Sequence, residues 1–489
     1  MSTGSIAESG SQSRGQLTDA QAIELLKEIE GRNRLYSVRS GRWSVWPLLK
    51  MTVMLKLTRL DLSSARTAPS SAKRATMALR DAAVMGRAAP ADVLIKTATS
   101  TLVDRQDGKY KDYIFDDLIA SLPSFHKIDA VVAAADMDRR ANALVPPIAS
   151  TAGPELVAAL GARLRTSDED RAAGAEISRV LRQELGLEEC TPAWTAFRIA
   201  HFNWSRAAYK EIFRRLCKKV VVVADPGEHA AVAAARELNL STVEFQHGLL
   251  NADHPGYEYS QVEKKDAAAI PMSDRFFMFG EYWRRTLSPM QFWAGRLQNA
   301  GSLRLDAYRR NRPQRTDRDS RTVVLTTQGI DTAVVISFLR RAWEKIPAAA
   351  NLRLVIKLHP IWDSDPAPFA GAFGRDSRVS IVSGSEEPNT LLVLSNADLH
   401  LSISSTCHYE ACALGVPTVV LPFRTSENMS SMVAAGHAIE VRSVDELVAV
   451  LTPTEAIRAH PEASSFYFEP DALANMRRML DEVLERRES

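Results

Sequence analysis

Residues 219–246 read KVVVVADPGEHAAVAAARELNLSTVEFQ. The β-branched run at 220–224 predicts a buried strand, the alanine-rich stretch at 229–238 predicts a helix, and residues 242–246 predict the next strand. A strand, a helix and a further strand in this order are typical of a parallel sheet covered by helices. The stretch therefore predicts a doubly wound α/β domain.

The same alternation extends in both directions along the chain. Upstream and downstream of this stretch, apolar runs predict strands at 91–96, 275–279 and 297–301. After an Arg/Asp-rich segment the pattern starts again, with strands expected at 322–327, 352–357, 379–382, 398–403 and 417–421, and helices at 332–345, 387–396 and 404–414. Two such domains in tandem enclose a cleft at the carboxyl ends of their strands, where ligands bind.

These patterns divide the chain of 489 residues into segments. Thr18 is a good cap for a helix that runs to about Gly31. Helix formers dominate residues 155–216, which we interpret as a helical insertion in the first domain. The expected segments are a disordered tail (1–18), a basic helical extension (19–90), an N-terminal Rossmann-like domain (91–312), a C-terminal Rossmann-like domain (313–470) with 309–321 as the linker between them, and a C-terminal helix (471–489).

Composition excludes several classes of protein. The four cysteines lack the spacing of a zinc site or a disulfide framework. No apolar run reaches the roughly 18 residues that span a bilayer, and the chain begins without a signal-peptide pattern. We therefore expect a cytoplasmic protein with reduced thiols.

Positive charge is concentrated near the N-terminus. Residues 31–90 hold twelve Lys/Arg and two Asp/Glu, although the whole chain has a formal charge of only +2. Trp43 and Trp46 precede an apolar stretch that includes Lys50 and Lys56, a pattern typical of helices lying in a membrane interface. We expect residues 39–62 to hold the protein on the anionic inner face of the cytoplasmic membrane. The alternatives are a helix packed on the body of the protein and, less favoured, a nucleic-acid surface; no nucleic-acid partner is expected.

The second half places polar side chains directly after two predicted strands. Residues 357–360 read KLHP, and a Ser/Ser/Thr cluster follows the strand at 398–403. A helix N-terminus offers unpaired N–H groups and a positive dipole end, so hydroxyls there suit a phosphate. His359 would bind that phosphate or protonate it as it leaves. The alternative is that Ser404 and His359 only cap helices.

Glu410 lies one to two turns into the same predicted helix, where a carboxylate can accept hydrogen bonds from both ribose hydroxyls. The alternative is an exposed helix glutamate without a ligand. The expected donor-binding residues are Lys357, His359, Pro360, Ser404, Ser405, Thr406 and Glu410.

These motifs carry a resemblance. KLHP and SISSTCHYEACALGVPTVVLP (402–422) resemble the HP and paired-serine motifs of GT-B transferases of bacterial surface glycans. Those families include bacterial sialyltransferases, capsular Kdo transferases and CDP-glycerol glycerophosphotransferases. The resemblance implies a GT-B fold, two Rossmann-like domains facing a cleft, and a cytidine nucleotide whose phosphate contacts His359, Ser404 and Ser405. It covers mainly residues 322–425.

The first domain has its own candidate loop. Residues 244–248 read EFQHG and end a predicted strand. Glycine lets the backbone approach a ligand, and an imidazole is suited to take a proton from an acceptor hydroxyl. The segment resembles the Trp-His-Gly segment of the glycerophosphotransferases, with Gln246 in the tryptophan position. We expect His247 to be the base and Gln246, Gly248 and His254 to form the acceptor loop.

Alternatives to His247 as the base remain open. Asp253 or His254 would serve from the same loop, Glu281 is a weaker candidate, and His247 would then only fix the loop.

Two triplets, Asp136-Met137-Asp138 and Asp363-Ser364-Asp365, resemble metal-binding DxD motifs, but such triplets are frequent in a chain with 59 acidic residues. A helix dipole and basic side chains can offset a diphosphate without metal, so we expect neither a metal nor a cofactor beyond the nucleotide-sugar substrate. No Walker loop or GxGxxG follows a strand, which leaves ATPases and dehydrogenases without support.

The expected function is that of an inverting, metal-independent glycosyltransferase. It would move a sugar from a nucleotide-activated donor, with a CMP-linked donor favoured, to a lipid-linked or growing surface polysaccharide. Alternatives are a CDP-polyol phosphotransferase and a UDP-sugar 2-epimerase, whose phosphate-binding helix also carries Glu-Ala followed by Gly-x-Pro. The interfacial pattern at 39–62 argues against an epimerase, which acts on a soluble substrate. A glycan-binding module of an export assembly is the non-enzymatic alternative.

Overall fold

The computed structural model describes residues 17–58, 69–251, 253–310, 320–360, 362–384 and 388–485. Several sequence predictions fall partly outside these ranges. They are the disordered tail up to residue 16, the basic extension at 59–68 with the end of the interfacial segment at 59–62, the linker at 311–319, the first residue of the helix expected at 387–396, and the end of the C-terminal helix at 486–489.

The first domain is built on a parallel sheet of seven strands in the order β11-β10-β9-β8-β3-β6-β7. Parallel pairing of neighbours such as Val223 with Glu244 confirms the expectation from residues 219–246. The strands are β3 (Ala91–Ala98), β6 (Phe125–Ala130), β7 (Ala149–Ser150), β8 (Cys217–Val223), β9 (Ser241–Phe245), β10 (Arg275–Met278) and β11 (Leu297–Asn299).

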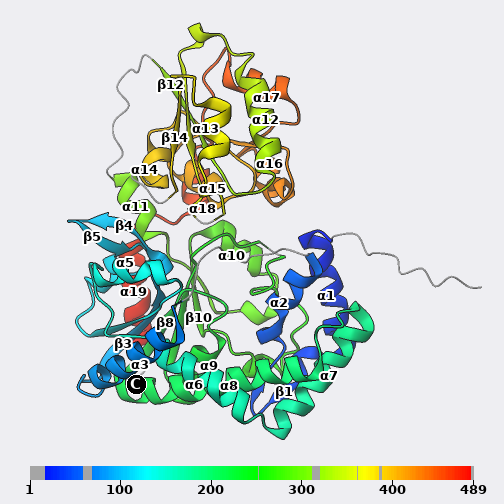
Figure 1. The fold of residues 1–489 in the computed structure, drawn as a ribbon, viewed down its shortest axis with the longest axis vertical. Helices are drawn as coiled ribbons and strands as arrows, with labels where there is room; N and C mark the ends of the chain where they lie inside the picture. The colour runs from blue at the N-terminus through cyan, green and yellow to red at the C-terminus, as the bar shows by residue number, and fades with distance from the viewer. Residues whose placement is uncertain are drawn as a thin grey trace, which may run out of the picture.

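Helices cover this sheet and extend to one side of it (Figure 1). They are α3 (Ser71–Met85), α4 (Asp116–Ile119), α5 (Met137–Ala141), α6 (Ala152–Leu164), α7 (Asp168–Leu185), α8 (Pro192–Leu216), α9 (His229–Glu237) and α10 (Glu281–Leu287). Helices α6 to α8 are the helical region expected at 155–216. A small antiparallel hairpin, β4 (Leu102–Gln106) with β5 (Lys109–Asp112), lies near α11 at the edge of the first domain (Figure 1).

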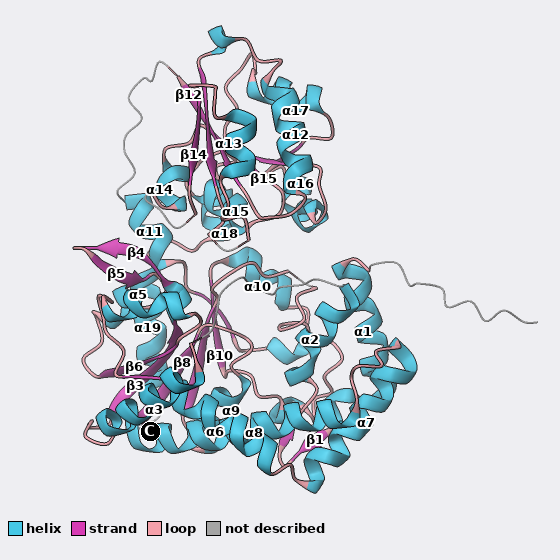
Figure 2. Ribbon diagram, viewed as in Figure 1, coloured by secondary structure: helices cyan, strands magenta, loops and turns pink. Residues whose placement is uncertain are grey.

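The second domain repeats the architecture with a parallel sheet of six strands, in the order β14-β13-β12-β15-β16-β17. Its strands are β12 (Arg321–Thr326), β13 (Leu352–Lys357), β14 (Val379–Val382), β15 (Leu399–Ser402), β16 (Thr418–Val420) and β17 (Ile439–Glu440). Its helices are α12 (Thr332–Trp343), α13 (Ala367–Phe373), α14 (Thr390–Ser395), α15 (Thr406–Ala413), α16 (Ser430–Ala434) and α17 (Val444–Leu451). Helix α11 (Leu303–Arg310) lies between the domains (Figure 2).

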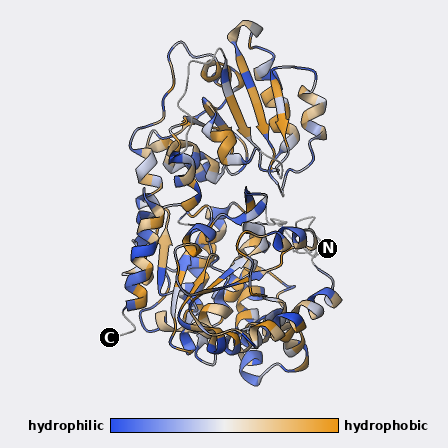
Figure 3. Ribbon diagram, turned by 90° about the vertical axis from the view of Figure 1, so that its left-hand side faces the viewer, coloured by the Kyte–Doolittle hydropathy of each residue, from blue (hydrophilic) through white to orange (hydrophobic). Residues whose placement is uncertain are grey.

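Both sheets are apolar layers between more polar helices (Figure 3). Val220, Val221 and Val222 in the first sheet and Val323 and Val324 in the second have no exposed surface. Runs of β-branched residues favour strands that are buried on both faces, which explains why these segments were predicted correctly. The two Rossmann-like domains form the expected GT-B fold.

The C-terminal segment returns to the first domain after the second is complete. Helix α18 (Ala463–Tyr467) contacts α15, and α19 (Ala472–Glu485) packs Met476, Met479 and Leu480 against the first sheet. The crossing passes so close to Gly301, whose φ is +93°, that a Cβ there would lie 2.4 Å from the carbonyl oxygen of Glu469. A glycine is therefore required where the chain crosses.

The basic extension begins as expected and then differs from the prediction. Thr18 caps α1 (Asp19–Asn33) in a capping box with Gln21. A short hairpin of β1 (Arg39–Ser40) and β2 (Trp43–Ser44) leads to α2 (Pro47–Thr58). Trp43 is 1% exposed and Trp46 fully buried, with their indole N–H groups donating to Glu237 and Glu30. The assignment of these tryptophans to a membrane interface is wrong, because residues 39–58 are packed on the first domain.

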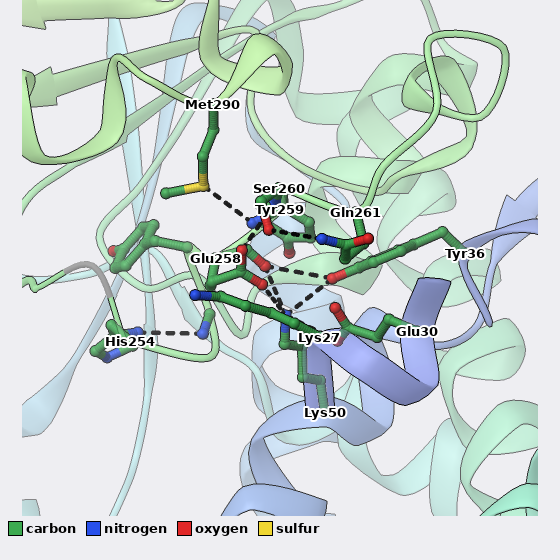
Figure 4. Close-up of polar contacts among 12 residues, drawn as sticks. Lys27, Glu30, Tyr36, Lys50, His254, Glu258, Tyr259, Ser260, Gln261 and Met290 are labelled. Carbon is green, nitrogen blue, oxygen red and sulfur yellow. Dashed lines mark hydrogen bonds and ion pairs between the residues drawn. The ribbon is translucent and has the colours of Figure 1, made fainter. Parts of the chain in front are cut away.

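Lys50 is buried for the same reason. Its Nζ lies 2.8 Å from Glu258 Oε2 and 2.9 Å from Glu30 Oε1, and it also donates to the hydroxyl of Tyr36 (Figure 4). A buried charge requires such partners. The positive charge of Lys50 therefore forms ion pairs inside the protein and does not lie at its surface.

Two other expectations concern the whole chain. In the ranges that the structure describes, no helix is long and apolar enough to cross a membrane. All four cysteines are free thiols, as expected.

Candidate functional site

A cavity of about 210 Å³ lies between the two domains. The first domain and α11 contribute Tyr113, Ile114, Phe245, Gln246, His247, Phe279, Gly301, Ser302, Leu303 and Arg304. The second domain and the returning C-terminal segment contribute His359, Pro360, Thr390, Ser405, Thr406, Cys407, Glu410, Phe468 and Met476. The cavity therefore brings together two candidate residues of the first half of the sequence, Gln246 and His247, and five of the second half: His359, Pro360, Ser405, Thr406 and Glu410.

The cavity lies at the carboxyl ends of strands from both sheets. His247 follows β9 (Ser241–Phe245) by two residues, and His359 follows β13 (Leu352–Lys357) by two. Ser405 follows β15 (Leu399–Ser402) by three. Because these strands are parallel within each sheet, their ends converge on one edge, which is where ligands bind in such folds.

Gln246 supports the loop that carries His247. Its side-chain Nε2 donates to the carbonyl oxygen of Gly248 at 3.0 Å, and its Oε1 accepts from the backbone N–H of Phe279 at 2.9 Å. Both ends of this buried amide are thus engaged by the backbone. His247, by contrast, is exposed at the cavity wall.

The other two candidate bases of the loop lie outside the cavity lining. Asp253 is near Lys27 of α1, and burial raises its pKa while Lys27 lowers it. His254 accepts a hydrogen bond from the N–H of Gly256 at 3.1 Å and packs on Tyr257. Burial, together with the charge of His247, lowers the pKa of His254 to about 4, so its ring is neutral at neutral pH. Glu281 is likewise outside, held by Arg284 and Arg285.

Within the KLHP segment, two residues line the cavity and the other two are buried in the second domain. The backbone N–H of His359 donates to Thr327 Oγ1 at 3.0 Å, and its Nδ1 accepts from the N–H of Trp362 at 3.1 Å. With Nδ1 as an acceptor, the proton of the neutral ring is on Nε2, which is then a donor. Pro360 also lines the cavity, whereas Lys357 is buried and its Nζ donates to the carbonyl oxygen of Ser383.

In the Ser/Ser/Thr cluster, two residues line the cavity and the third does not. Ser405 caps α15, accepting from the N–H of Cys407 at 3.2 Å, so the helix begins at Thr406 rather than at Ser404. Ser405 and Thr406 face the cavity. Ser404 is 8% exposed, with its hydroxyl bonded to Thr425 and its N–H donating to Gln328 Oε1 at 2.7 Å.

Glu410 lines the cavity one turn further along α15. Burial raises the pKa of its carboxyl group, while the charge of Arg304 and a hydrogen bond from Cys407 oppose the shift. Burial and these two neighbours thus shift the pKa of this carboxyl group in opposite directions. Titratable groups in a cavity whose pKa is shifted by burial and by a charged partner are common at functional sites.

Arg304 was not identified from the sequence as a site residue. Its guanidinium forms two hydrogen bonds with Asp104, at 2.8 and 2.7 Å, and lies over the ring of Tyr113. Among the described residues lining the cavity, Arg304 is the one Lys or Arg side chain. Its position three residues after Gly301, in the first turn of the helix that follows β11, was the available signal.

The two DxD-like triplets are outside the cavity. Asp136 is buried and accepts from Thr99 Oγ1, and burial raises the pKa of Asp363. Within the parts of the chain that the structure describes, no group of three or more His, Cys, Asp or Glu side chains is arranged to hold a metal ion. Independence from metal stays a prediction.

The sequence matches no protein-family model and no curated protein. Among solved structures, the UDP-GlcNAc 2-epimerase of Methanocaldococcus jannaschii is similar over 80% of this chain and 99% of its own, with 14% identity and a TM-score of 0.49. The UDP-GlcNAc 2-epimerase of Neisseria meningitidis, bound to UDP-GlcNAc, covers 81% and 100% at 14% identity and a TM-score of 0.48. The calicheamicin glycosyltransferase CalG4 covers 82% and 99% at 12% identity and a TM-score of 0.48. The fold assignment itself rests on the two parallel sheets.

Proposed function

We propose that the cavity binds a nucleotide-activated sugar and that the protein is an inverting glycosyltransferase that needs no metal. The observation that carries the proposal is the presence of His247 from one domain and His359, Ser405, Thr406 and Glu410 from the other in one cavity. The donor is a CMP-linked sugar by preference, and the acceptor is a lipid-linked or growing surface glycan. The protein works in the cytoplasm, at the inner face of the membrane.

The donor phosphate binds at the start of α15. The N–H groups of the first turn and the hydroxyls of Ser405 and Thr406 donate to it, aided by the positive end of the helix dipole. The Nε2 proton of His359 stabilises the charge that develops as the nucleotide leaves. Glu410 accepts from the ribose hydroxyls, and Arg304 adds a fixed positive charge from the side of the first domain.

The acceptor approaches from the first domain. His247 takes the proton of the acceptor hydroxyl as its oxygen attacks the anomeric carbon, and the bond from that carbon to the donor phosphate breaks on the opposite face. One displacement of this kind inverts the anomeric configuration. Gln246 acts as a positioning residue because its side-chain amide links the backbone of Gly248, directly after His247, to the backbone of Phe279.

A UDP-sugar 2-epimerase is the second candidate. It needs acid and base groups around a bound nucleotide sugar but no acceptor, and Glu410, whose pKa is raised, lies in the same cavity as His247 and His359. The packing of residues 39–58 also removes the objection that an epimerase has no use for a membrane segment. A CDP-polyol phosphotransferase would use the same phosphate site.

One set of measurements separates these candidates. Thermal unfolding is followed with CMP, CDP, UMP, UDP and GDP, because a ligand at 100 times its dissociation constant adds about 2.7 kcal/mol of stability. Stabilisation by CMP favours a CMP-sugar, and stabilisation by CDP favours a polyol phosphate. UDP-GlcNAc is then incubated in D₂O without acceptor, where deuterium at C2 identifies an epimerase. Stabilisation by none of the nucleotides would contradict every form of the proposal.

A further inference from the structure

Two neighbouring helices of the first domain expose apolar side chains. On α3, Leu79 is 76% exposed and Val84 is 40% exposed; on α6, the exposed fractions are 44% for Val157, 56% for Leu160 and 84% for Leu164. These are five of the nine exposed large hydrophobic residues in the described part of the chain. The two helices are in contact, and Arg74 of α3 pairs with Glu155 of α6 at 3.6 Å. Several exposed apolar side chains on two contacting helices indicate an interaction surface.

Exposed basic residues lie on or next to the same two helices. Lys73 and Arg80 are exposed seven residues apart, which places them along one side of α3, and Arg87 is exposed just beyond the C-terminal end of this helix. Arg163 and Arg165 are exposed at the end of α6. Counting only described residues, none of these five side chains is in an ion pair.

The carboxylates of α3 and α6 are both engaged by neighbouring groups. The carboxylate of Asp81 is buried and accepts from the N–H and hydroxyl of Ser150, while Glu155 is engaged by Arg74 and Thr151. The surface is therefore apolar and basic. We call it the α3–α6 face; its members are Lys73, Leu79, Arg80, Val84, Arg87, Val157, Leu160, Arg163, Leu164 and Arg165.

We propose that the α3–α6 face docks on an anionic lipid bilayer. Leucine and valine side chains enter the boundary between headgroups and acyl chains, and the lysine and arginine side chains contact lipid phosphates. A second copy of the chain fits this face less well, because pairing two such faces would bring the five basic side chains of one copy close to the same five of the other, and these like charges repel. A nucleic acid matches the charge but gains nothing from the leucines. The proposal is independent of the reaction in the cavity.

This docking surface differs from the one expected from the sequence. The tryptophans and Lys50 of residues 39–58 are buried, whereas α3 and α6 lie at the end of the first domain opposite the second domain (Figure 1). A docked molecule thus directs its interdomain cavity away from the bilayer. An acceptor that reaches the cavity is then the distal end of a long lipid-linked glycan rather than a sugar next to the lipid.

The test is flotation of the full chain with vesicles of phosphatidylcholine containing about 30% phosphatidylglycerol, compared with phosphatidylcholine alone. The wild-type protein should float with the anionic vesicles at low salt and much less at high salt, because screening weakens surface charge. R80E/R87E and L79Q/L160Q/L164Q should each lower the partition coefficient at least about tenfold. Since all five substituted side chains are exposed, both variants should keep the melting temperature of the wild type.

V334Q/R341E is the matched control, since it changes an exposed valine and an exposed arginine on α12 of the second domain. It should float like the wild type. Wild-type protein that stays at the bottom of the gradient at low salt overturns the proposal, as does equal flotation of R80E/R87E. A dimer without lipid that L79Q/L160Q/L164Q converts to a monomer would instead assign the face to a second copy.

Discussion

His247 and His359 come from different domains and line the same cavity, each two residues beyond the end of its strand. Their environments differ. The Nδ1 of His359 accepts a backbone hydrogen bond from Trp362, whereas His247 is exposed at the start of the loop that Gln246 supports. A fixed ring suits a donor of a hydrogen bond to a phosphate, and an accessible ring suits exchange of a proton with an acceptor.

Replacement of His359 with Ala should lower turnover by a factor of about 100 to 10,000, the usual contribution of a positioned acid or hydrogen-bond donor. The measurement is the rate of nucleotide release from the donor identified by the thermal panel. His460→Ala is the control, because His460 is an exposed histidine outside the cavity lining. Unchanged turnover in His359→Ala would remove this residue from the mechanism.

Ser405→Ala tests the helix N-terminus as the phosphate site. Loss of the cap should lower the free energy of unfolding by about 1 kcal/mol, and it should also reduce the rise in melting temperature caused by nucleotide. Ser443 caps α17 in the same way, by accepting from Glu446, but lies outside the cavity. Ser443→Ala should cost similar stability and leave nucleotide binding intact; equal nucleotide effects in both variants would argue against Ser405 as a ligand.

Buried histidines should make the second domain sensitive to acid. His400 and His408 share the hydroxyl of Thr418, at 2.7 and 2.6 Å, and burial lowers the pKa of both rings, that of His408 to about 4. The unfolded ring keeps a pKa near 6.5. Between these values the unfolded chain binds a proton that the folded protein does not, so stability falls as pH drops from about 6.5 to about 4.

Urea unfolding at several pH values measures this effect. The contribution of His408 reaches about 3 kcal/mol at the acid end of the window. His408→Gln should make the decline with falling pH shallower, and His460→Gln, at an exposed position, should leave it unchanged. An identical decline in wild type and His408→Gln would show that other groups cause the acid sensitivity.

Lys50→Met should destabilise the protein by about 3 to 5 kcal/mol, because it leaves the carboxylates of Glu30 and Glu258 buried without a cation. Lys56→Met removes a partly exposed pair with Glu189 and should cost less than about 1 kcal/mol. The triple variant K50M/E30Q/E258Q removes the unpaired charges and should recover part of the loss. Equal stability of Lys50→Met and Lys56→Met in urea would contradict the role given to the buried pairs.

The sequence predicted those strands that are continuous apolar runs. The run at 220–224 became β8 (Cys217–Val223), and the run at 352–357 became β13 (Leu352–Lys357). Strand β6 (Phe125–Ala130) was missed because it contains Lys127 and Asp129. Both charges are tolerated in the sheet through ion pairs, of Lys127 with Asp116 at 2.6 Å and of Asp129 with Arg140 at 2.9 Å.

Short motifs were enough to select His247, His359, Ser405, Thr406 and Glu410, which line one cavity, because strand ends and helix starts can be recognised locally; their roles stay predictions. Arg304 was missed, since its partner Asp104 lies 200 residues away in the chain. Lys357 and Ser404 were included because they adjoin the motifs, although their side chains are bonded inside the second domain.

The sequence by itself determined the two parallel sheets, since apolar runs at strand length can be buried in few other ways. It also determined which strand ends carry imidazole, hydroxyl and carboxyl groups. Only the tertiary structure decided which charges and tryptophans face water. Trp46 and Lys50 belong to a segment with the composition of a membrane-binding helix, but in the folded protein Trp46 donates to Glu30 and Lys50 pairs with Glu258. Leu79 and Leu164, by contrast, are not covered by any described part of the chain. Burial depends on contacts between distant segments, and a local pattern cannot specify those contacts.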